Sequence, residues 1–276
     1  MTEPIHEPSN DVSRRRLLSA SLLLTPLGLT ACAHPVASAP PMPLPDGLRA
    51  GEQHPFHLVD PNVAADAAGI ANTAPYPRMQ MAIPAGYGDG ARPWPLLVFL
   101  HGAGERGSDI EDVKRGGPPM LADRGVAYPM LVCSPQVDPG MRWQPARLHA
   151  LVAALRQRFA IDERRVTATG LSLGGSGVWR WACDYPQDLA AIAPVCGWVD
   201  PAAVAAMRRV PVRGYHGELD PLVPLARQQA SIDELRRQGG SASFKVYAGV
   251  GHDAWTAAYE DPALVPWLLA QVRPGR

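Results

Sequence analysis

The chain has 276 residues, with 26 Lys and Arg against 26 Asp and Glu, and 46% of its residues are hydrophobic. This balance of charge excludes long-range attraction to nucleic acid or to an anionic surface as the basis of function. The length suffices for one α/β domain of ordinary size or for two small ones, and the hydrophobic content allows a large core.

The N-terminal segment predicts an export signal. Three arginines at 14–16 precede an apolar stretch at 17–29, and small residues follow it, which is the layout of a signal peptide. The stretch is shorter than the ~20 residues that a membrane-spanning helix needs. The start SRRRLL resembles a twin-arginine signal, although the basic start of a general secretory signal fits nearly as well.

The signal ends in LTAC at 29–32, which resembles a lipobox, so Cys32 is the predicted site of lipidation. The alternative is an ordinary signal peptide with a chance cysteine. Ala33 follows instead of Asp, and in lipoproteins of this kind that permits transfer to the outer membrane. We therefore expect a signal peptide at 1–31, a lipid-anchored Pro/Ala-rich tether at 32–52, and a domain at 53–276 that lies on the periplasmic side of the envelope.

The mature chain alternates between predicted strands and helices. Alternating patterns predict antiparallel edge strands at 54–59 and 76–84, and continuous apolar runs predict buried strands at 95–102 and 130–135. Further strands are expected at 164–170, 190–197, 210–217 and 242–249, and helices at 146–159, 174–185, 224–239 and 261–272. This order predicts an α/β fold with a mostly parallel, doubly wound sheet flanked by helices.

A candidate nucleophile lies between the predicted strand at 164–170 and the helix after it. The segment GLSLG at 170–174 matches G-x-S-x-G in the strand–turn–helix context that this motif requires. Glycines are needed there because a sharp turn leaves no room for side chains beside Ser172. The alternative is a tight turn with an incidental serine, but the residues described next favour a reactive hydroxyl.

A serine hydroxyl is a weak nucleophile without a base. Asp220 and His252 each follow a predicted strand, so both are expected at the same edge of the sheet as Ser172, in the chain order typical of this fold. His252 would accept the proton of Ser172, and Asp220 would hold the imidazole in the required tautomer. Glu218 and Asp253 are the rival carboxylates.

An oxyanion site is expected beside the nucleophile. The backbone amides of Leu173 and Ala103 are its predicted donors, with Gly104 as the alternative to Ala103. His101 begins this loop and is interpreted as a structural residue. Another histidine, His216, is interpreted as a buried brace below Asp220.

Two tryptophans are candidates for the substrate pocket, namely Trp143 and Trp198, whereas Trp255 is expected to support the loop of His252. No spacing of His, Cys or Asp in the sequence is typical of a metal site, and no glycine-rich segment has the Lys-Ser/Thr of a phosphate loop. We therefore expect neither a metal nor a cofactor.

Several segments together resemble the α/β-hydrolase superfamily, and within it the dienelactone hydrolase and prolyl-oligopeptidase-related group often labelled predicted peptidases or phospholipase/carboxylesterases. They are LHGAGERGSD, TGLSLGGSGVW, YPQDLAAIAPVCG, HGELDPLVP and GVGHDAWTAAYED, and the similarity runs from about residue 75 to the C-terminus. The resemblance implies a triad of Ser172, Asp220 and His252 and a carboxylic ester as substrate. The chain departs from the group at 197–200, where GWVD replaces a frequent run of glycines.

The sequence thus predicts an exported serine esterase that forms an acyl-enzyme and acts on a small-molecule or carbohydrate-linked ester. A serine peptidase or phospholipase on the same triad is the alternative, and a non-catalytic binding lipoprotein is the alternative of another class. No insertion between Ser172 and His252 is long enough for a separate lid domain, so an open site and short acyl groups are expected. A disulfide between Cys133 and Cys196 is predicted not to form, whereas a disulfide between Cys183 and Cys196 is possible.

Overall fold

The computed structural model describes residues 42–58, 74–90 and 92–275. The predicted signal peptide and Cys32 lie outside the described residues. Of the predicted tether, residues 42–52 are described, and Leu44 and Leu48 within it pack against the hydrophobic core of the following domain.

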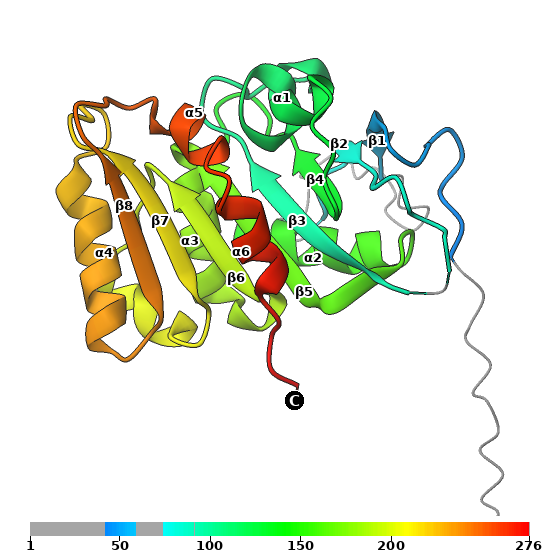
Figure 1. Cartoon of the computed structure of the whole chain (residues 1–276). Coiled ribbons are helices and arrows are strands. Elements are labelled where there is room, and N and C mark those ends of the chain that lie inside the picture. Colours follow the sequence, from blue (N-terminus) through cyan, green and yellow to red (C-terminus); the bar gives the residue numbers. More distant parts are fainter. Residues whose placement is uncertain (1–41, 59–73, 91, 276) are drawn as a thin grey trace, which may run out of the picture. The chain divides into compact units, whose positions relative to one another are not determined.

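One eight-stranded sheet organises the domain, in the order β1-β2-β4-β3-β5-β6-β7-β8 (Figure 1). The pairs β1–β2 and β2–β4 are antiparallel, and all other neighbouring strands are parallel. The strands are β1 Gln53–His57, β2 Arg78–Ala82, β3 Trp94–Leu100, β4 Leu131–Pro135, β5 Ile161–Leu171, β6 Ala191–Val195, β7 Val212–Gly217 and β8 Ala242–Tyr247. The predicted mostly parallel sheet is therefore confirmed.

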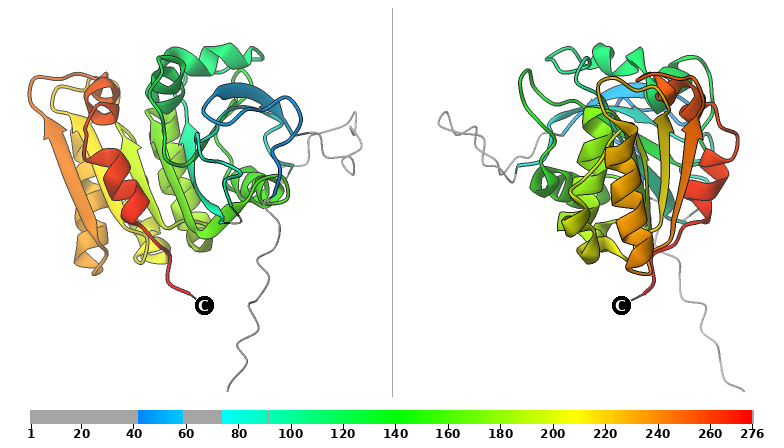
Figure 2. Two further views of the ribbon diagram at one scale, coloured as in Figure 1. Left: turned by 45° about the vertical axis from the view of Figure 1, so that its right-hand side comes forward. Right: turned by 90° about the vertical axis from the view of Figure 1, so that its left-hand side faces the viewer.

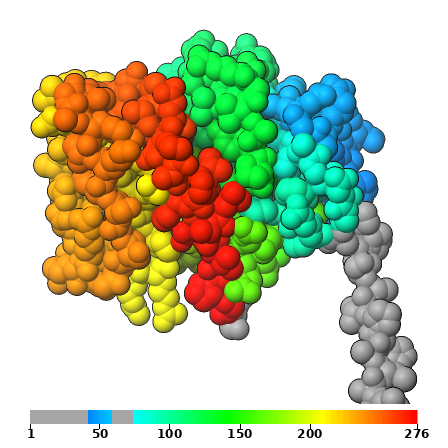
Figure 3. All heavy atoms as spheres, in the orientation of Figure 1, coloured from blue at the N-terminus to red at the C-terminus, as the bar shows by residue number. Residues whose placement is uncertain are grey.

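Helices cover both faces of this sheet (Figure 2). One face carries α2 Pro145–Arg156, α3 Leu173–Asp184 and α4 Leu225–Arg237, and the other carries α1 Gly117–Asp123, α5 Ala254–Tyr259 and α6 Leu264–Ala270. Three 3-10 helices complete the described elements: η1 Ile110–Arg115, η2 Pro186–Asp188 and η3 Pro201–Met207. Figure 3 shows the C-terminal segment, in red, lying over the middle of the second face. None of the described helices has the length and apolar character that crossing a membrane requires.

The central strands contribute side chains to two hydrophobic clusters, one on each face of the sheet. In β3, Leu96, Val98 and Leu100 belong to the cluster with α2, α3 and α4, whereas Leu97 and Phe99 belong to the cluster with α1, α5 and α6. Successive side chains of a strand point to opposite faces, so a strand covered on both sides is apolar throughout. This is why the continuous run at 95–102 is a buried strand, as predicted.

The structure corrects three details of the sequence prediction. The strand predicted at 76–84 is not at the edge, because β2 bonds to both β1 and β4. The single helix predicted at 261–272 is shorter and begins only at Leu264, because Asp261 forms a turn in which its carboxylate accepts the amide of Ala263. The short helices α1 and α5 were not predicted.

The three described cysteines, Cys133, Cys183 and Cys196, are buried free thiols. Strands β3 and β5 separate β4, which carries Cys133, from β6, which Cys196 follows. The Cys133–Cys196 bridge is therefore absent, as predicted, and the structure answers the open question of Cys183–Cys196 with two unbridged thiols.

Candidate active site

Ser172 occupies the turn between β5 and α3 in a backbone conformation that is rare for residues other than glycine. Its φ is 52° and its ψ is −111°, and its amide donates to the carbonyl of Val195 at 2.9 Å. Such strain costs on the order of 1–3 kcal/mol and persists only where the surrounding fold enforces it.

Glycines on both sides of Ser172 make this turn possible. A Cβ on Gly170 would lie 2.5 Å from the carbonyl oxygen of Gly174, and a Cβ on Gly174 would overlap the carbonyl group of Leu100. The steric role that the sequence assigned to these glycines therefore agrees with the close backbone packing between β5, α3 and β3.

His252 lies between the hydroxyl of Ser172 and the carboxylate of Asp220. Its Nε2 is 2.9 Å from Ser172 Oγ, and its Nδ1 is 2.7 Å from Asp220 Oδ2. The carboxylate only accepts hydrogen bonds, so Nδ1 carries the proton and Nε2 presents a lone pair to the hydroxyl. The structure thus brings the three predicted residues into one hydrogen-bonded chain.

Asp220 is held in place by its own turn. Its Oδ1 accepts the amides of Leu222 and Val223, each at 2.9 Å. Burial acts to raise the pKa of the Asp220 carboxyl, but the bonds from His252 and from these two amides outweigh it, and the pKa lies below its usual value. The carboxylate is therefore ionised at neutral pH.

The rival carboxylates point elsewhere. Glu218 accepts the amide of Gly249 at 2.9 Å, and Asp253 accepts the hydroxyl of Thr256 at 2.8 Å. Asp220 is thus the carboxylate that contacts His252 Nδ1, and the preference for it over Glu218 and Asp253 agrees with the geometry.

Further groups support the loop of His252. The ring of Trp255 stands edge-on to the imidazole, with 5.2 Å between the ring centroids. The thiol of Cys196 donates to the carbonyl of His252 at 3.3 Å. Cys196 has a φ of 49° at the end of β6, and sequence reasoning missed its part in the site because only its spacing to other cysteines was considered.

The loop after β3 lies beside the same edge of the sheet and contains the predicted oxyanion donor Ala103, which is exposed. His101 fixes the start of this loop: its Nδ1 lies 2.6 Å from the carbonyl of Gly102, and its Nε2 accepts the amide of Val137 at 3.1 Å. Burial lowers the pKa of His101 to about 4, so the ring is neutral and acts as a structural brace. The second predicted donor, Leu173, is the first residue of α3.

A cavity of about 780 Å³ is lined by Leu173, the residue after Ser172, and by Trp143 and Trp198. Trp143 is 6% exposed, and its indole nitrogen donates to the carbonyl of His101 at 3.1 Å. The ring of Trp198 lies under the guanidinium of Arg227, 4.5 Å from its carbon, a contact that keeps the indole oriented. Both tryptophans therefore lie where the sequence placed candidate pocket residues.

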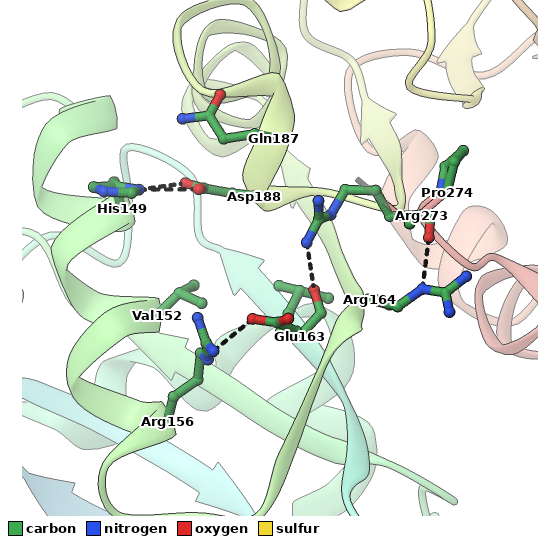
Figure 4. Close-up of a pocket in the computed structure, with 11 residues that line it drawn as sticks. His149, Val152, Arg156, Glu163, Arg164, Gln187, Asp188, Arg273 and Pro274 are labelled. Carbon is green, nitrogen blue, oxygen red and sulfur yellow. Dashed lines mark hydrogen bonds and ion pairs between the residues drawn. The ribbon is translucent and has the colours of Figure 1, made fainter.

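Another cavity, of about 470 Å³, lies at the opposite edge of the sheet (Figure 4). Two of its side-chain pairs are in contact: His149 lies 2.9 Å from Asp188, and Arg156 contacts Glu163. Arg164 and Arg273 donate to backbone carbonyls. None of the residues predicted for catalysis lines it.

Comparison with known proteins identifies similar hydrolases. Residues 131–262 match the Dienelactone hydrolase family. The chain is 32% identical over 232 residues to putative esterase NocK of Nocardia uniformis subsp. tsuyamanensis, covering 77% of this chain and 66% of that protein. It is 25% identical over 194 residues to a probable carboxylesterase of Oryza sativa subsp. japonica, covering 59% and 73% of the two chains.

A thermostable esterase of known structure superposes with a TM-score of 0.64 at 27% identity, covering 80% of this chain and 64% of that one. The chain thus spans about two thirds of the length of NocK and of this esterase.

Proposed function

We propose that the chain, which has the fold of the α/β-hydrolases and matches the Dienelactone hydrolase family over residues 131–262, is a serine hydrolase that cleaves carboxylic esters. The observation that carries the proposal is the hydrogen-bonded chain from Ser172 through His252 to Asp220. A serine placed for packing alone would need neither a strained turn nor an imidazole with its lone pair on the hydroxyl.

In the proposed reaction Ser172 Oγ attacks the ester carbonyl while His252 Nε2 takes the hydroxyl proton. Asp220 stabilises the imidazolium that forms, and the imidazolium then passes its proton to the alcohol as the ester bond breaks. Water attacks the resulting acyl-enzyme with His252 again as base, and the acid and free serine are released.

The tetrahedral intermediates carry a negative oxygen that needs donors. We propose the amides of Leu173 and Ala103 for this role. Leu173 is in the first turn of α3, where amides have no acceptor within the helix and favour negative charge. Ala103 follows the segment that His101 braces, so its amide belongs to a loop of fixed conformation.

The cavity lined by Leu173 favours a small acyl group. Trp143 and Trp198 line it with flat apolar surfaces, and Trp198 is held by Arg227. The described stretch from Ser172 to His252 contains only the elements of the domain and no inserted lid. The alcohol, including a sugar or an aromatic ring, would then face solvent.

A fluorophosphonate probe tests the nucleophile. We expect it to label the protein once, and Ser172→Ala to lose both the label and ester hydrolysis, with turnover falling by roughly 10³ or more. Ser243→Ala, on the outer strand β8, is the matched control and should keep both. Ester hydrolysis or labelling that survives in Ser172→Ala would refute the nucleophile assignment.

We also propose that the protein is exported and anchored at the periplasmic face of the outer membrane through a lipid on Cys32. The support is the sequence alone: arginines, an apolar stretch and LTAC, in that order. Cys32→Ser should move the protein from the membrane fraction to the soluble fraction, because the lipid supplies the apolar burial. Membrane fractionation unchanged by the substitution would contradict the anchor.

A further inference from the structure

Asp220 contacts two histidines. Its Oδ2 lies 2.7 Å from Nδ1 of His252 and 3.3 Å from Nε2 of His216. His216, near the end of β7, is fully buried, as is the carboxylate of Asp220. The acid of the proposed triad therefore lies between a histidine that faces the reacting serine and a histidine sealed inside the protein.

Both ring nitrogens of His216 face groups that accept hydrogen bonds. Nε2 lies 2.9 Å from the carbonyl oxygen of Val223, in addition to its contact with Asp220. Nδ1 lies 2.5 Å from Oε1 of Gln228. A carbonyl and a carboxylate offer no proton, so Nε2 has to carry one.

The orientation of Gln228 decides the state of Nδ1. An amide side chain can be turned so that its oxygen and nitrogen exchange places. The other end of this buried amide contacts the carbonyl oxygen of Pro194 at 3.1 Å, which only accepts. The NH₂ group of Gln228 must therefore face Pro194, and its oxygen must face His216. Nδ1 consequently carries a proton as well.

A histidine with two N–H groups is an imidazolium, and inside a protein it needs a counter-charge. The groups that face His216 from the surrounding elements are Asp220, the thiol of Cys196 after β6, the amide of Gln228 on α4 and the ring of Phe244 on β8. Burial raises the pKa of Cys196 to about 12, so that thiol is neutral. Asp220 is thus the negative group among them.

We propose that His216 carries a proton on both ring nitrogens and forms a buried ion pair with Asp220, acting as a positioning residue for the proposed triad. The proposal rests on the proposed hydrolase function for its role and on hydrogen bonding for its charge. The Asp220 carboxylate then contacts a cation through Oδ2 and accepts the amides of Leu222 and Val223 through Oδ1. These contacts fix the position of Oδ2, which also contacts His252.

The charge of His216 also weakens the negative potential that Asp220 exerts on His252. With a neutral His216, the buried pair of Asp220 and His216 would have a net charge of −1. With an imidazolium at His216, the net charge of the pair is zero. A less negative surrounding disfavours protonation of His252 by solvent. The base stays available at lower pH, so the enzyme should keep activity on the acidic side.

The protonation state can be measured on the full chain without any substitution. Protein labelled with ¹⁵N-histidine is observed by NMR at neutral pH, and His216 is assigned through its contact with the ring of Phe244. We expect both nitrogens of His216 to carry protons. A single unprotonated nitrogen at neutral pH would overturn the proposal, and it would do so even if the protein hydrolysed no ester.

The role in catalysis is tested by His216→Gln, which keeps a donor for Val223 and removes the charge. The acidic limb of the kcat/KM profile should move to higher pH by about one unit, with a smaller change at the plateau. His149→Gln, a paired histidine at the other edge of the sheet, should leave the profile in place. A limb that does not move in His216→Gln would contradict the proposed role, since a merely structural brace would lower the rate at every pH alike.

Discussion

Two aspartate–histidine pairs occupy opposite edges of the sheet and differ in what lies beyond the imidazole. His252 contacts Asp220 through Nδ1 at 2.7 Å, and His149 contacts Asp188 through Nδ1 at 2.9 Å. Beyond His252 is the hydroxyl of Ser172 at 2.9 Å. His149 instead has an exposed side chain that stacks on the ring of Tyr185, with 4.7 Å between centroids.

The difference shows that an acid and a base in contact do not make a reactive site. Asp188 also accepts the indole proton of Trp181 at 2.9 Å, so it ties α3 to the segment before β6. In the Asp220 pair the free imidazole nitrogen faces a hydroxyl that the backbone strain of Ser172 places at the end of the chain of bonds. Reactivity is thus inferred from the group that the second imidazole nitrogen contacts, which is the hydroxyl of Ser172.

Substituting the two histidines in parallel gives the largest expected contrast. His252→Gln removes the base, and hydrolysis of nitrophenyl butyrate should fall by roughly 10³ or more in kcat. His149→Gln should keep kcat within about twofold, because His149 lines a cavity that contains none of the proposed catalytic residues. Comparable losses in the two variants would break the distinction between the edges.

A third histidine, His101, is buried but has a structural role, so burial of a histidine does not indicate reactivity. The pKa of His101 is lowered to about 4 by burial, against about 6.5 in an unfolded chain. The unfolded state therefore binds more protons between these values, and stability is lost as pH falls through this window. His101 should contribute a loss of about 3 kcal/mol in the free energy of unfolding by pH 4.

Urea unfolding at pH 7 and pH 4 measures this loss. His101→Gln keeps a donor and an acceptor and should reduce the difference between the two pH values, whereas His149→Gln should not. An unchanged difference in His101→Gln would show that other groups cause the acid sensitivity.

The smallest expected effect is on the preference for short over long acyl chains, and it distinguishes the two cavities. The cavity with Trp143 and Trp198 should favour butyryl over dodecanoyl nitrophenyl esters by roughly tenfold. Trp198→Ala should reduce this preference, whereas Gln187→Ala, in the cavity of Figure 4, should leave it unchanged. A maximum at long chains, with activation at an interface, would contradict the open site with a short acyl pocket.

Sequence reasoning predicted the parts of the molecule that follow local rules. Ser172 was predicted at the turn between a strand and a helix because these elements and the G-x-S-x-G motif succeed one another in the chain, and the structure places it there. Asp220 and His252 were predicted to lie near Ser172 because parallel strands end at the same edge of a sheet, and β7 and β8 are parallel neighbours. The central strands were found because burial on both faces requires a continuous apolar run.

What sequence reasoning missed depends on contacts between distant residues. The strain at Cys196 is set by neighbouring strands, since its amide donates to Tyr215 and its thiol to His252. The charge proposed for His216 depends on Gln228 and Pro194, which lie on two other elements. Helices α1 and α5, with seven and six residues, are too short for a periodic pattern to separate them from loops.

The glycines in the first turn of α3 have a consequence for protein engineering. Side chains at Gly174 or Gly175 would collide with the backbones of Leu100 and Val195, so saturation mutagenesis there should yield unfolded protein at nearly every codon. Libraries intended to alter substrate preference should instead vary the segment 198–203, where Trp198, Val199, Asp200 and Ala203 line the cavity without supporting the turn of Ser172. Selection for new substrates would then change the residues that line the cavity and leave the turn around Ser172 intact.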